Sequence, residues 1–260
     1  MPLPWQEALE ALGLELSPQA CGRLQAHLDL IAKWNRVYNL TAVRDPAEMV
    51  THHLLDSLAA VPPLAAYLAG QHLEAAARSQ QRVRDVGVLS VDQRASASSG
   101  PAQPPVHVLD VGAGAGLPGV TMAIALPEAL ARRVEGAPAP APVPVQVTCV
   151  DAVAKKAGFI RQVAAELGLS QLQALHGRIE SLGLPKANVI TCRAFASLSD
   201  IVRLTHLHLA PGGVWMALKG VTPTEEIAAL PPGIDVFHVE PLQVPGLDAQ
   251  RCLVWMRPSP

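Results

Sequence analysis

The sequence has 260 residues and a mass of 27.4 kDa, with 50% apolar and only 16% charged residues. This composition excludes a chain that is disordered throughout, and it provides enough apolar surface for one large core or for a main domain with a small one. The formal net charge is -2 and the pI is near 6.5, so no overall basic field marks the chain as a nucleic-acid binder. Contact with RNA would therefore have to come from a local basic patch.

The distribution of cysteine and apolar residues favours a cytoplasmic protein. The four cysteines are scattered without a Cys-x-x-Cys pair, which fits neither a disulfide framework nor a zinc site. Residues 1–10 carry Glu7 and Glu10 where a secretory signal needs a basic start and an apolar run. The uncharged stretches 111–127 and 136–150 are broken by glycine or proline before they reach the roughly 18 residues of a membrane helix. We therefore expect neither export nor insertion into a membrane.

The N-terminal part of the sequence predicts a small helical unit over residues 1–65. Apolar residues recur with the helical period over residues 21–35 and predict an amphipathic helix. Asp45 followed by Pro46 predicts the start of a second helix, with the carboxylate as N-cap and the proline at the first helical position. We expect that helix to end against the proline pair 62–63, because proline lacks an N–H and its ring clashes with helical bonding.

Beyond this unit the sequence predicts a linker and then an α/β domain over residues 106–260. Residues 66–105 lose the apolar period and end in a low-complexity run rich in alanine, serine and proline. Seven short runs rich in valine, isoleucine and leucine then predict strands at 106–111, 145–150, 172–175, 189–192, 214–218, 234–239 and 252–256. Their alternation with helical segments predicts a mostly parallel seven-stranded sheet that is buried on both faces, with a closing antiparallel strand. A Pro/Ala spacer at 136–144 interrupts the pattern.

The most informative segment is a glycine-rich turn directly after the first predicted strand. Residues 106–119 read Val-His-Val-Leu-Asp-Val-Gly-Ala-Gly-Ala-Gly-Leu-Pro-Gly, a buried strand followed by a turn and the start of an apolar helix. Glycines let a ligand approach the backbone closely, and the start of the helix offers unpaired N–H groups and the positive end of the helix dipole. The segment therefore predicts a binding site for a nucleotide-like ligand rather than a plain turn.

The pattern of this turn is compatible with two cofactors. The spacing Gly114-x-Gly116-x-x-Gly119 satisfies the dinucleotide fingerprint read literally, which would make the chain an NAD-dependent oxidoreductase. In that fingerprint the first glycine closes the strand, whereas here Gly112 does so and Asp110 precedes it. The resulting form, Asp-x-Gly-x-Gly-x-Gly, resembles motif I of the class I S-adenosylmethionine-dependent methyltransferases.

Residues at later strand ends bear on the same choice. Asp151 follows the second predicted strand and is placed to bind the ribose hydroxyls of a nucleotide cofactor. The NAD hypothesis would rely on Glu135, which lies beside the spacer rather than at a strand end. After the third strand, Ile179 could cover an adenine ring and Glu180 could accept from its amine. Taken alone, that segment is more simply a solvated helix start.

The fourth predicted strand ends in Arg193-Ala-Phe-Ala, at the edge where open α/β sheets bind their ligands. Amino-group methyltransferases usually carry an Asp/Asn-Pro-Pro-aromatic tetrapeptide there, and this sequence lacks it. Methylation of guanine N7 needs no base, because N7 has a free lone pair and loses no proton. Arg193 suits contact with a phosphate, a base edge or a cofactor carboxylate, and a structural salt bridge is the alternative.

Five segments carry a more specific resemblance: 33–45, 53–57, 112–119, 193–198 and 217–220. In combination they resemble the bacterial small-subunit (16S) ribosomal RNA guanine-N7 methyltransferase family, the RsmG or GidB type. The resemblance implies that a cytoplasmic, monomeric enzyme transfers methyl from S-adenosyl-L-methionine to N7 of one guanine, position 527 of 16S ribosomal RNA, in the small ribosomal subunit. It also implies cofactor contacts at Gly112, Leu117, Ile179, Glu180 and Arg193.

The remaining constellations each have two interpretations. His52, His53 and Asp56 could hold a metal ion, but a polar helix face is favoured and no metal is expected. Cys149 and Cys192 could supply the thiolate of a cytosine-C5 methyltransferase, although buried strand cysteines more often pack as small hydrophobes. Five basic residues have two interpretations: they could form a basic rim that binds RNA phosphates, or they could be ordinary solvated surface charges. They are Lys155, Lys156, Arg161, Lys219 and Arg251. A noncatalytic RNA- or ribosome-binding module on the same fold is the third hypothesis for the whole chain.

Overall fold

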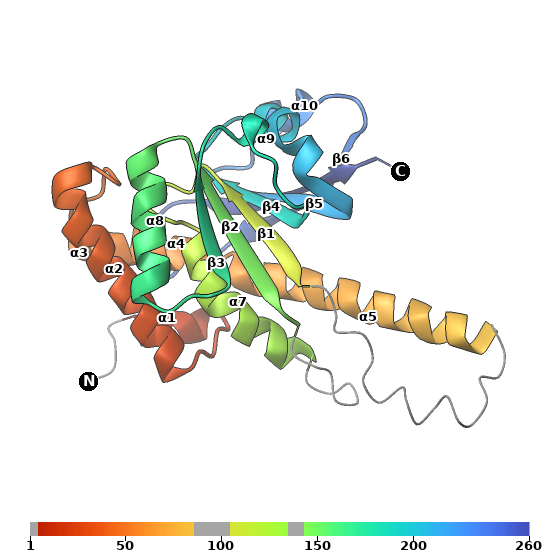
Figure 1. Ribbon diagram of the computed structural model, residues 1–260, viewed down its shortest axis with the longest axis horizontal. Coiled ribbons are helices and arrows are strands. Elements are labelled where there is room, and N and C mark those ends of the chain that lie inside the picture. The colour runs from red at the N-terminus through yellow and green to blue at the C-terminus, as the bar shows by residue number, and fades with distance from the viewer. Residues whose placement is uncertain (1–4, 86–104, 135–142, 260) are drawn as a thin grey trace.

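The computed structural model describes residues 5–85, 105–134 and 143–259 of the chain (Figure 1). Residues 86–104 of the expected linker (66–105) and residues 136–142 of the Pro/Ala spacer (136–144) therefore lie outside the described residues, as does Glu135. Within the described residues, none of the helices combines the length and the apolar character needed to cross a membrane.

The first two helices of the described residues are α1 (Gln6–Ala11) and α2 (Pro18–Tyr38). The hydroxyl of Ser17 accepts from the backbone N–H of Ala20, and Pro18 occupies the first helical position, so the start of α2 is well capped. Asn39 ends the helix in the left-handed conformation, with φ of 48°. The amphipathic helix predicted over residues 21–35 is thus confirmed and extends further in both directions.

The segment after Asp45 differs from its prediction. The Asp45 carboxylate does cap a helix by accepting from the N–H of Ala47 at 2.8 Å, as expected. The continuous helix is instead divided into α3 (Pro46–Met49), a π-helical turn η1 (Val50–Leu55) and α4 (Asp56–Leu58). The predicted end at prolines 62 and 63 is wrong, because both lie in the first turn of a new helix, α5 (Val61–Asp85). Proline is tolerated there, since the first N–H groups of a helix have no helical partner.

The seven predicted strands are all present and form one sheet. Their bounds are β1 (Val106–Val111), β2 (Val145–Asp151), β3 (Leu172–His176), β4 (Ala187–Arg193), β5 (Leu209–Lys219), β6 (Ile234–Leu242) and β7 (Arg251–Pro258). The order is β3-β2-β1-β4-β5-β7-β6. Strands β1 to β5 are parallel, and β7 runs antiparallel to both β5 and β6, which confirms the predicted closing antiparallel strand.

Helices cover both faces of this sheet. The elements between the strands are α7 (Gly119–Val134), α8 (Ala154–Glu166), η2 (Ile179–Ser181), α9 (Leu198–Thr205), η3 (His206–His208) and α10 (Thr224–Ala228). One core joins α2, α4, α5, α7 and α8 to one face, and a second core joins α9 and η2 to the other. Figure 1 shows α5 passing beside α7, with its later turns extending beyond the sheet.

Alternate side chains of each strand enter the two cores. Val108 lies in the first core and Leu109 in the second, and on β5 Met216 and Trp215 divide in the same way. Strands that are buried on both faces read as continuous apolar runs, which is why they were visible in the sequence. The division into residues 1–65, 66–105 and 106–260 remains a prediction, although its first boundary falls inside α5.

Candidate functional site

The glycine turn lies where the chain order of the sheet reverses. The chain proceeds from β1 to β2 and β3 on one side, and it returns to β4 and β5 on the other. The carboxyl ends of β1 and β4 therefore border the crevice in which open α/β sheets bind ligands. Gly112 begins the turn with φ of 73°, a left-handed conformation that favours glycine, and its N–H donates to the carbonyl of Val150 on β2 at 2.9 Å.

Asp110 links the end of β1 to the start of α7. Its Oδ2 accepts from the N–H of Gly119 at 2.8 Å, so the carboxylate lies at the positive end of the α7 dipole. A Cβ at position 119 would lie 2.3 Å from Sγ of Cys149 and 2.7 Å from the same Asp110 oxygen, which explains the glycine. Asp110 is fully buried, and this burial raises its pKa to about 7, against the opposing effects of the Gly119 N–H and the Arg193 charge.

Asp151 closes the other side of the turn from the end of β2. Its Oδ2 accepts from the N–H of Gly114 at 2.9 Å, and its Oδ1 accepts from the N–H of Val153 at 2.8 Å. The expected ribose-binding carboxylate therefore already stabilises the backbone on which a nucleotide would lie. Each carboxylate oxygen carries a further lone pair, so these two bonds leave acceptor capacity for a ligand hydroxyl.

Arg193, at the end of β4, is anchored to the N-terminal helices. Its Nη1 donates to Oδ2 of Asp56 and to the carbonyl of His52, both at 2.8 Å. The other oxygen of Asp56, Oδ1, accepts from Nε of Arg251 at 2.7 Å. The Asp56 side chain is only 5% exposed, whereas the two arginine side chains are 21% and 25% exposed. One buried carboxylate thus holds two guanidinium groups at the crevice edge of the sheet.

The same region contains buried polar atoms without hydrogen-bond partners among the described residues. They are Oδ1 of Asp110 on β1 and Oγ1 of Thr191 on β4, together with Nδ1 of His53 and Oγ of Ser57 from the N-terminal helices. Asp110 and Thr191 are register partners, and Ser57 adjoins the Asp56 that binds Arg193. Unsatisfied buried polar atoms are rare in native proteins and call for a partner. A ligand that carries both an ammonium and a carboxylate group fits this set together with Arg193.

Phe195, for which the sequence predicted no role, lies at the crevice edge of the sheet. Its ring lies against Gly112, where a Cβ would stand 2.3 Å from Cδ2 of the ring. The residue is 37% exposed, which is unusual for phenylalanine. Its position directly after a buried strand was the available sequence signal, but the contact joins residues that are distant in the chain.

The other predicted cofactor residues lie in two settings. Leu117 is buried in the turn before α7. Ile179 is also buried, and its carbonyl accepts from Nε2 of His208 at 2.9 Å, whereas Glu180 is exposed. The helix predicted to open at this point is a single 3-10 turn, η2. The cofactor contacts of these three residues stay predictions.

The candidate cysteine nucleophiles have the wrong environment for that role. Cys149 and Cys192 are buried free thiols. Burial raises the pKa of Cys192 to about 12 and that of Cys149 well above its usual range, so neither forms a thiolate near neutral pH. The interpretation of these residues as small packing groups is confirmed.

The predicted metal constellation and basic rim are divided among other interactions. Nε2 of His53 lies 2.6 Å from Oγ1 of Thr41, and Asp56 is bound by the two arginines. Lys219 pairs with Glu226 at 2.8 Å, while Lys155 is exposed. A basic rim on this edge therefore stays a prediction. Two of its residues, Lys219 and Arg251, are already paired with the carboxylates of Glu226 and Asp56.

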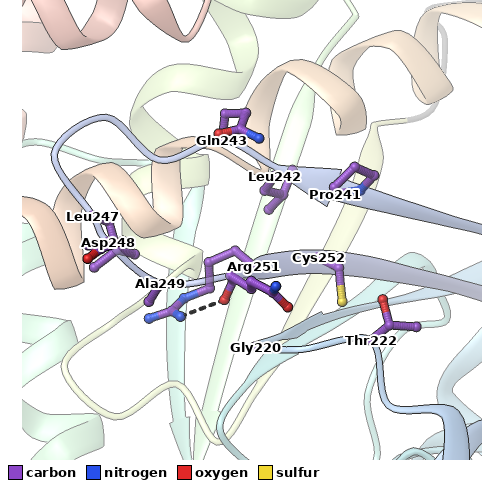
Figure 2. A pocket seen from close by; sticks show the side chains of 11 residues that line it. Gly220, Thr222, Pro241, Leu242, Gln243, Leu247, Asp248, Ala249, Arg251 and Cys252 are labelled. Atoms are coloured by element: carbon purple, nitrogen blue, oxygen red, sulfur yellow. Dashed lines mark hydrogen bonds between the residues drawn. The ribbon is translucent and has the colours of Figure 1, made fainter.

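A cavity lies at the same edge of the sheet, beyond β5. Figure 2 shows its lining, which comes from the segment after β5, the end of β6, the loop between β6 and β7, and the start of β7. Its volume is about 620 Å³, and its residues include Gly220, Thr222, Asp248 and Arg251. Nη1 of Arg251 donates to the carbonyl of Gln250 at 2.8 Å. Since Arg251 also binds Asp56, this cavity and the Arg193 side of the crevice share one buried carboxylate.

These features together define a class I S-adenosylmethionine-dependent methyltransferase: the sheet order, the Asp-x-Gly-x-Gly-x-Gly turn after β1 and the acid at the end of β2. A family model described as GidB, rRNA small subunit methyltransferase G, matches residues 20–70 and 95–254. The chain belongs to this family. It is therefore an enzyme whose cofactor is S-adenosylmethionine, and the alternatives of an NAD-dependent oxidoreductase and a noncatalytic module are not supported.

Curated relatives agree along almost the whole chain. A protein of Methylibium petroleiphilum named ribosomal RNA small subunit methyltransferase G is 51% identical over 251 residues, which is 96% of this chain and 91% of the relative. A protein of the same name from Acidovorax sp. strain JS42 is 48% identical over 253 residues, 97% of this chain and 93% of the relative.

Solved structures of methyltransferases are more distant. TrmN from Thermus thermophilus is 22% identical with a TM-score of 0.41, and the match covers 64% of this chain and 47% of that chain. The glycopeptide N-methyltransferase MtfA complexed with sinefungin is 13% identical with a TM-score of 0.46, over 65% of this chain and 86% of that chain.

Proposed function

We propose that this enzyme methylates N7 of one guanine in the 16S RNA of the small ribosomal subunit, at position 527 as the sequence resemblance implies. The observation that carries the proposal is the family match, which includes both the glycine turn and the Arg193 segment that border the crevice. Small-subunit RNA appears in the names of both curated relatives. The choice of guanine N7 as the atom that is methylated goes beyond these names, and it is supported by the chemistry of the site.

The carboxylates at the crevice edge favour an acceptor that needs no general base. Asp56 is paired with two arginines, and Glu226 is paired with Lys219. Asp151 accepts from two backbone N–H groups, and Asp110 is fully buried beneath the turn. When bound, S-adenosylmethionine would supply a methyl group on a sulfonium, and the lone pair of N7 would form the new N–C bond while the electrons of the broken S–C bond stay on sulfur. No proton leaves N7, so positioning and electrostatics suffice for the step.

The chain's own residues are assigned these roles toward the cofactor. Gly112 keeps the backbone open to close approach, and Leu117 packs behind the turn. Asp151 accepts from the ribose hydroxyls, and Arg193 pairs with the cofactor carboxylate while Asp56 holds it in place. Ile179 and Glu180 lie beyond β3, on the side that would receive the adenine.

The proposed setting is the cytoplasm, with the small ribosomal subunit as partner and the enzyme acting as a monomer. Small-subunit particles present folded RNA and protein together, so the guanine must be accessible at the surface of the particle when it is methylated. The 620 Å³ cavity beyond β5 opens on the same edge of the sheet as the glycine turn and offers room for RNA beside the target base.

The test uses purified full-length protein, labelled S-adenosylmethionine and small subunits from a strain that lacks the gene. N7-methylguanine is mapped by reduction and aniline cleavage of the RNA. We expect one new cleavage site, and we expect it to be absent with the Gly112→Asp variant, whose carboxylate would occupy the turn. Transfer to a different atom, or no transfer to subunits or to free RNA by a protein that binds the cofactor, would refute the proposed target.

A further inference from the structure

Phe195 is an exposed aromatic side chain beside the methyl-donor site. Among the described residues, the other exposed aromatic is Tyr38, whose ring packs on Trp34 with 5.1 Å between centroids. Phe195 instead lies against Gly112, which follows the carboxyl end of β1 in the turn proposed to bind the cofactor. Burying a phenylalanine side chain is favourable by about 1.5–3 kcal/mol, so leaving this ring partly exposed calls for an explanation.

The backbone holds the ring at this edge through a strained turn. Ala194 has φ of 51°, one of two non-glycine residues with positive φ among the described residues. Strain of this kind persists only where the surroundings fix it, and it concentrates at functional sites. The observed geometry therefore points to a use for the side chain that follows.

Two charged side chains, Lys219 and Glu226, hold the segment that follows Phe195. Nζ of Lys219 donates to the carbonyl of Ala196 at 3.0 Å and pairs with Oε2 of Glu226 at 2.8 Å. The same Glu226 oxygen accepts from the N–H of Leu198 at 2.7 Å, at the start of α9. The hydroxyl of Ser197 caps that helix. The turn is thus fixed at each residue that follows Phe195.

We propose that Phe195 forms the stacking surface for the target base, a purine extruded from the RNA strand into the crevice; this inference rests on the proposed function. Enzymes that modify a base inside folded nucleic acid take it out of its stack, and aromatic side chains receive it. The acceptor base must lie against the methyl donor, and Gly112 marks that place. The roles assigned to Ile179 and Glu180 put the adenine beyond β3, which leaves the β4 side, where Phe195 lies, for the base.

The ring also suits the charge change of the reaction. Methylation at N7 converts a neutral guanine into a cation, and the face of an aromatic ring attracts positive charge. Stacking on Phe195 therefore strengthens as the methyl group is transferred. An aliphatic side chain of similar volume would fill the space without this attraction, which separates a stacking role from simple packing.

The experiment compares Phe195→Leu and Phe195→Trp in the full chain, with Phe237→Leu as a matched control on the edge strand β6. Rates of methyl transfer are measured against the concentration of unmethylated small subunits at saturating cofactor. The dissociation constant for S-adenosylmethionine is measured separately by calorimetry. We expect Phe195→Leu to lower kcat/KM for subunits by about five- to 150-fold, the range that base–aromatic stacking energies give. Phe195→Trp should stay within about threefold of the wild type and leave cofactor affinity unchanged.

The outcomes separate this inference from the function on which it rests. If the wild type transfers no methyl group to subunits, the proposed function fails. If the wild type is active and Phe195→Leu equals it or the Phe237→Leu control, the stacking role is refuted. A loss confined to the dissociation constant of the cofactor, with kcat/KM for subunits unchanged at saturation, also refutes it by assigning the ring to the cofactor. Should Phe195→Leu fail to fold, kcat/KM for subunits is compared between Phe195→Trp and Phe195→His. A stacking role predicts the higher value for tryptophan, which has the larger ring, and equal values would refute it.

Discussion

Replacing Asp110 with asparagine tests the electrostatics of the glycine turn. The side chain is fully buried, and its Oδ2 accepts from the N–H of Gly119. Burial raises the pKa to about 7, whereas the same carboxyl in an unfolded chain has a pKa near 3.8. Asparagine keeps an oxygen that accepts from Gly119 and has no charge to lose, so it removes the titration with little change of shape.

The magnitude follows from proton linkage. Between pH 4 and 7 the folded protein holds a proton on Asp110 that the unfolded chain has released. The contribution of Asp110 to the free energy of unfolding is therefore fully present below about pH 4 and is lost as the pH rises through the folded pKa of about 7. About two pH units separate pH 5 from the folded pKa, at about 1.4 kcal/mol for each. Raising the pH from 5 to 8 should therefore remove about 3 kcal/mol of Asp110's contribution to the free energy of unfolding.

A second buried group has the opposite slope. His27 is fully buried, and its Nε2 donates to the carbonyl of Ala115 at 2.9 Å. Burial lowers its pKa to about 4, from 6.5 in the unfolded chain. The unfolded chain therefore binds more protons between these values, and the contribution of His27 is present above pH 6.5 and lost as the pH falls toward 4. From pH 5 to 8 it adds about 2 kcal/mol, nearly cancelling the effect of Asp110.

The assay is urea unfolding at several pH values from 5 to 8, without cofactor. The wild type should show a nearly flat dependence on pH from these two groups, while Asp110→Asn should gain about 2 kcal/mol toward pH 8. His27→Gln should show the reverse, because Asp110 then titrates alone. The difference between wild type and Asp110→Asn isolates the carboxyl group from all other titrations. Parallel curves for these two proteins would refute the raised pKa.

Two further substitutions test the geometry of the site. Gly112→Ala places a methyl group 2.3 Å from the Phe195 ring at φ of 73°, so it should lower the free energy of unfolding by about 1–3 kcal/mol and weaken cofactor binding at least tenfold. Adding Phe195→Ala should recover part of the stability in urea titrations, and strictly additive effects would contradict the contact. Asp56→Asn removes the charge that pairs with Arg193 and Arg251, so it should cost about 3 kcal/mol of stability and weaken cofactor binding. An unchanged melting curve and an unchanged dissociation constant would show that Asp56 holds neither arginine.

The sheet was predictable from the sequence because of how its strands are buried. Strands covered on both faces carry continuous apolar runs, and β1 was predicted with its observed bounds. The start of β5 was missed because residues 209–213 include a proline and two glycines, which indicate a turn rather than a strand. The helix α5 was missed for a related reason, because a pair of prolines normally indicates the end of a helix. These two prolines are tolerated within α5 because they lie in its first turn.

The glycine turn and the acid after β2 were predictable because each depends on a local pattern. A strand that ends in glycine, with an acid just before it, needs no information from elsewhere in the chain. The contacts that complete the site are different in kind. Asp56 pairs with residues 137 and 195 positions further along the chain. Periodicity and spacing carry no signal at such separations, so Arg193 was left with several interpretations.

The pairing of Asp56 with both arginines gives the N-terminal helices a part in the site. Without that carboxylate, two cations would lie together at the edge of β4 and β7 and repel each other. The π-helical turn η1 and the short α4 place Asp56 where it binds Arg193 and Arg251, so the break in the helix that was predicted to be continuous positions this carboxylate. Arg193 is proposed to pair with the cofactor carboxylate and Arg251 lines the cavity beyond β5, and both bind the buried carboxylate of Asp56. One buried carboxylate therefore positions both arginines, so a substitution at Asp56 changes the geometry of the crevice at Arg193 and that of the cavity lining at Arg251.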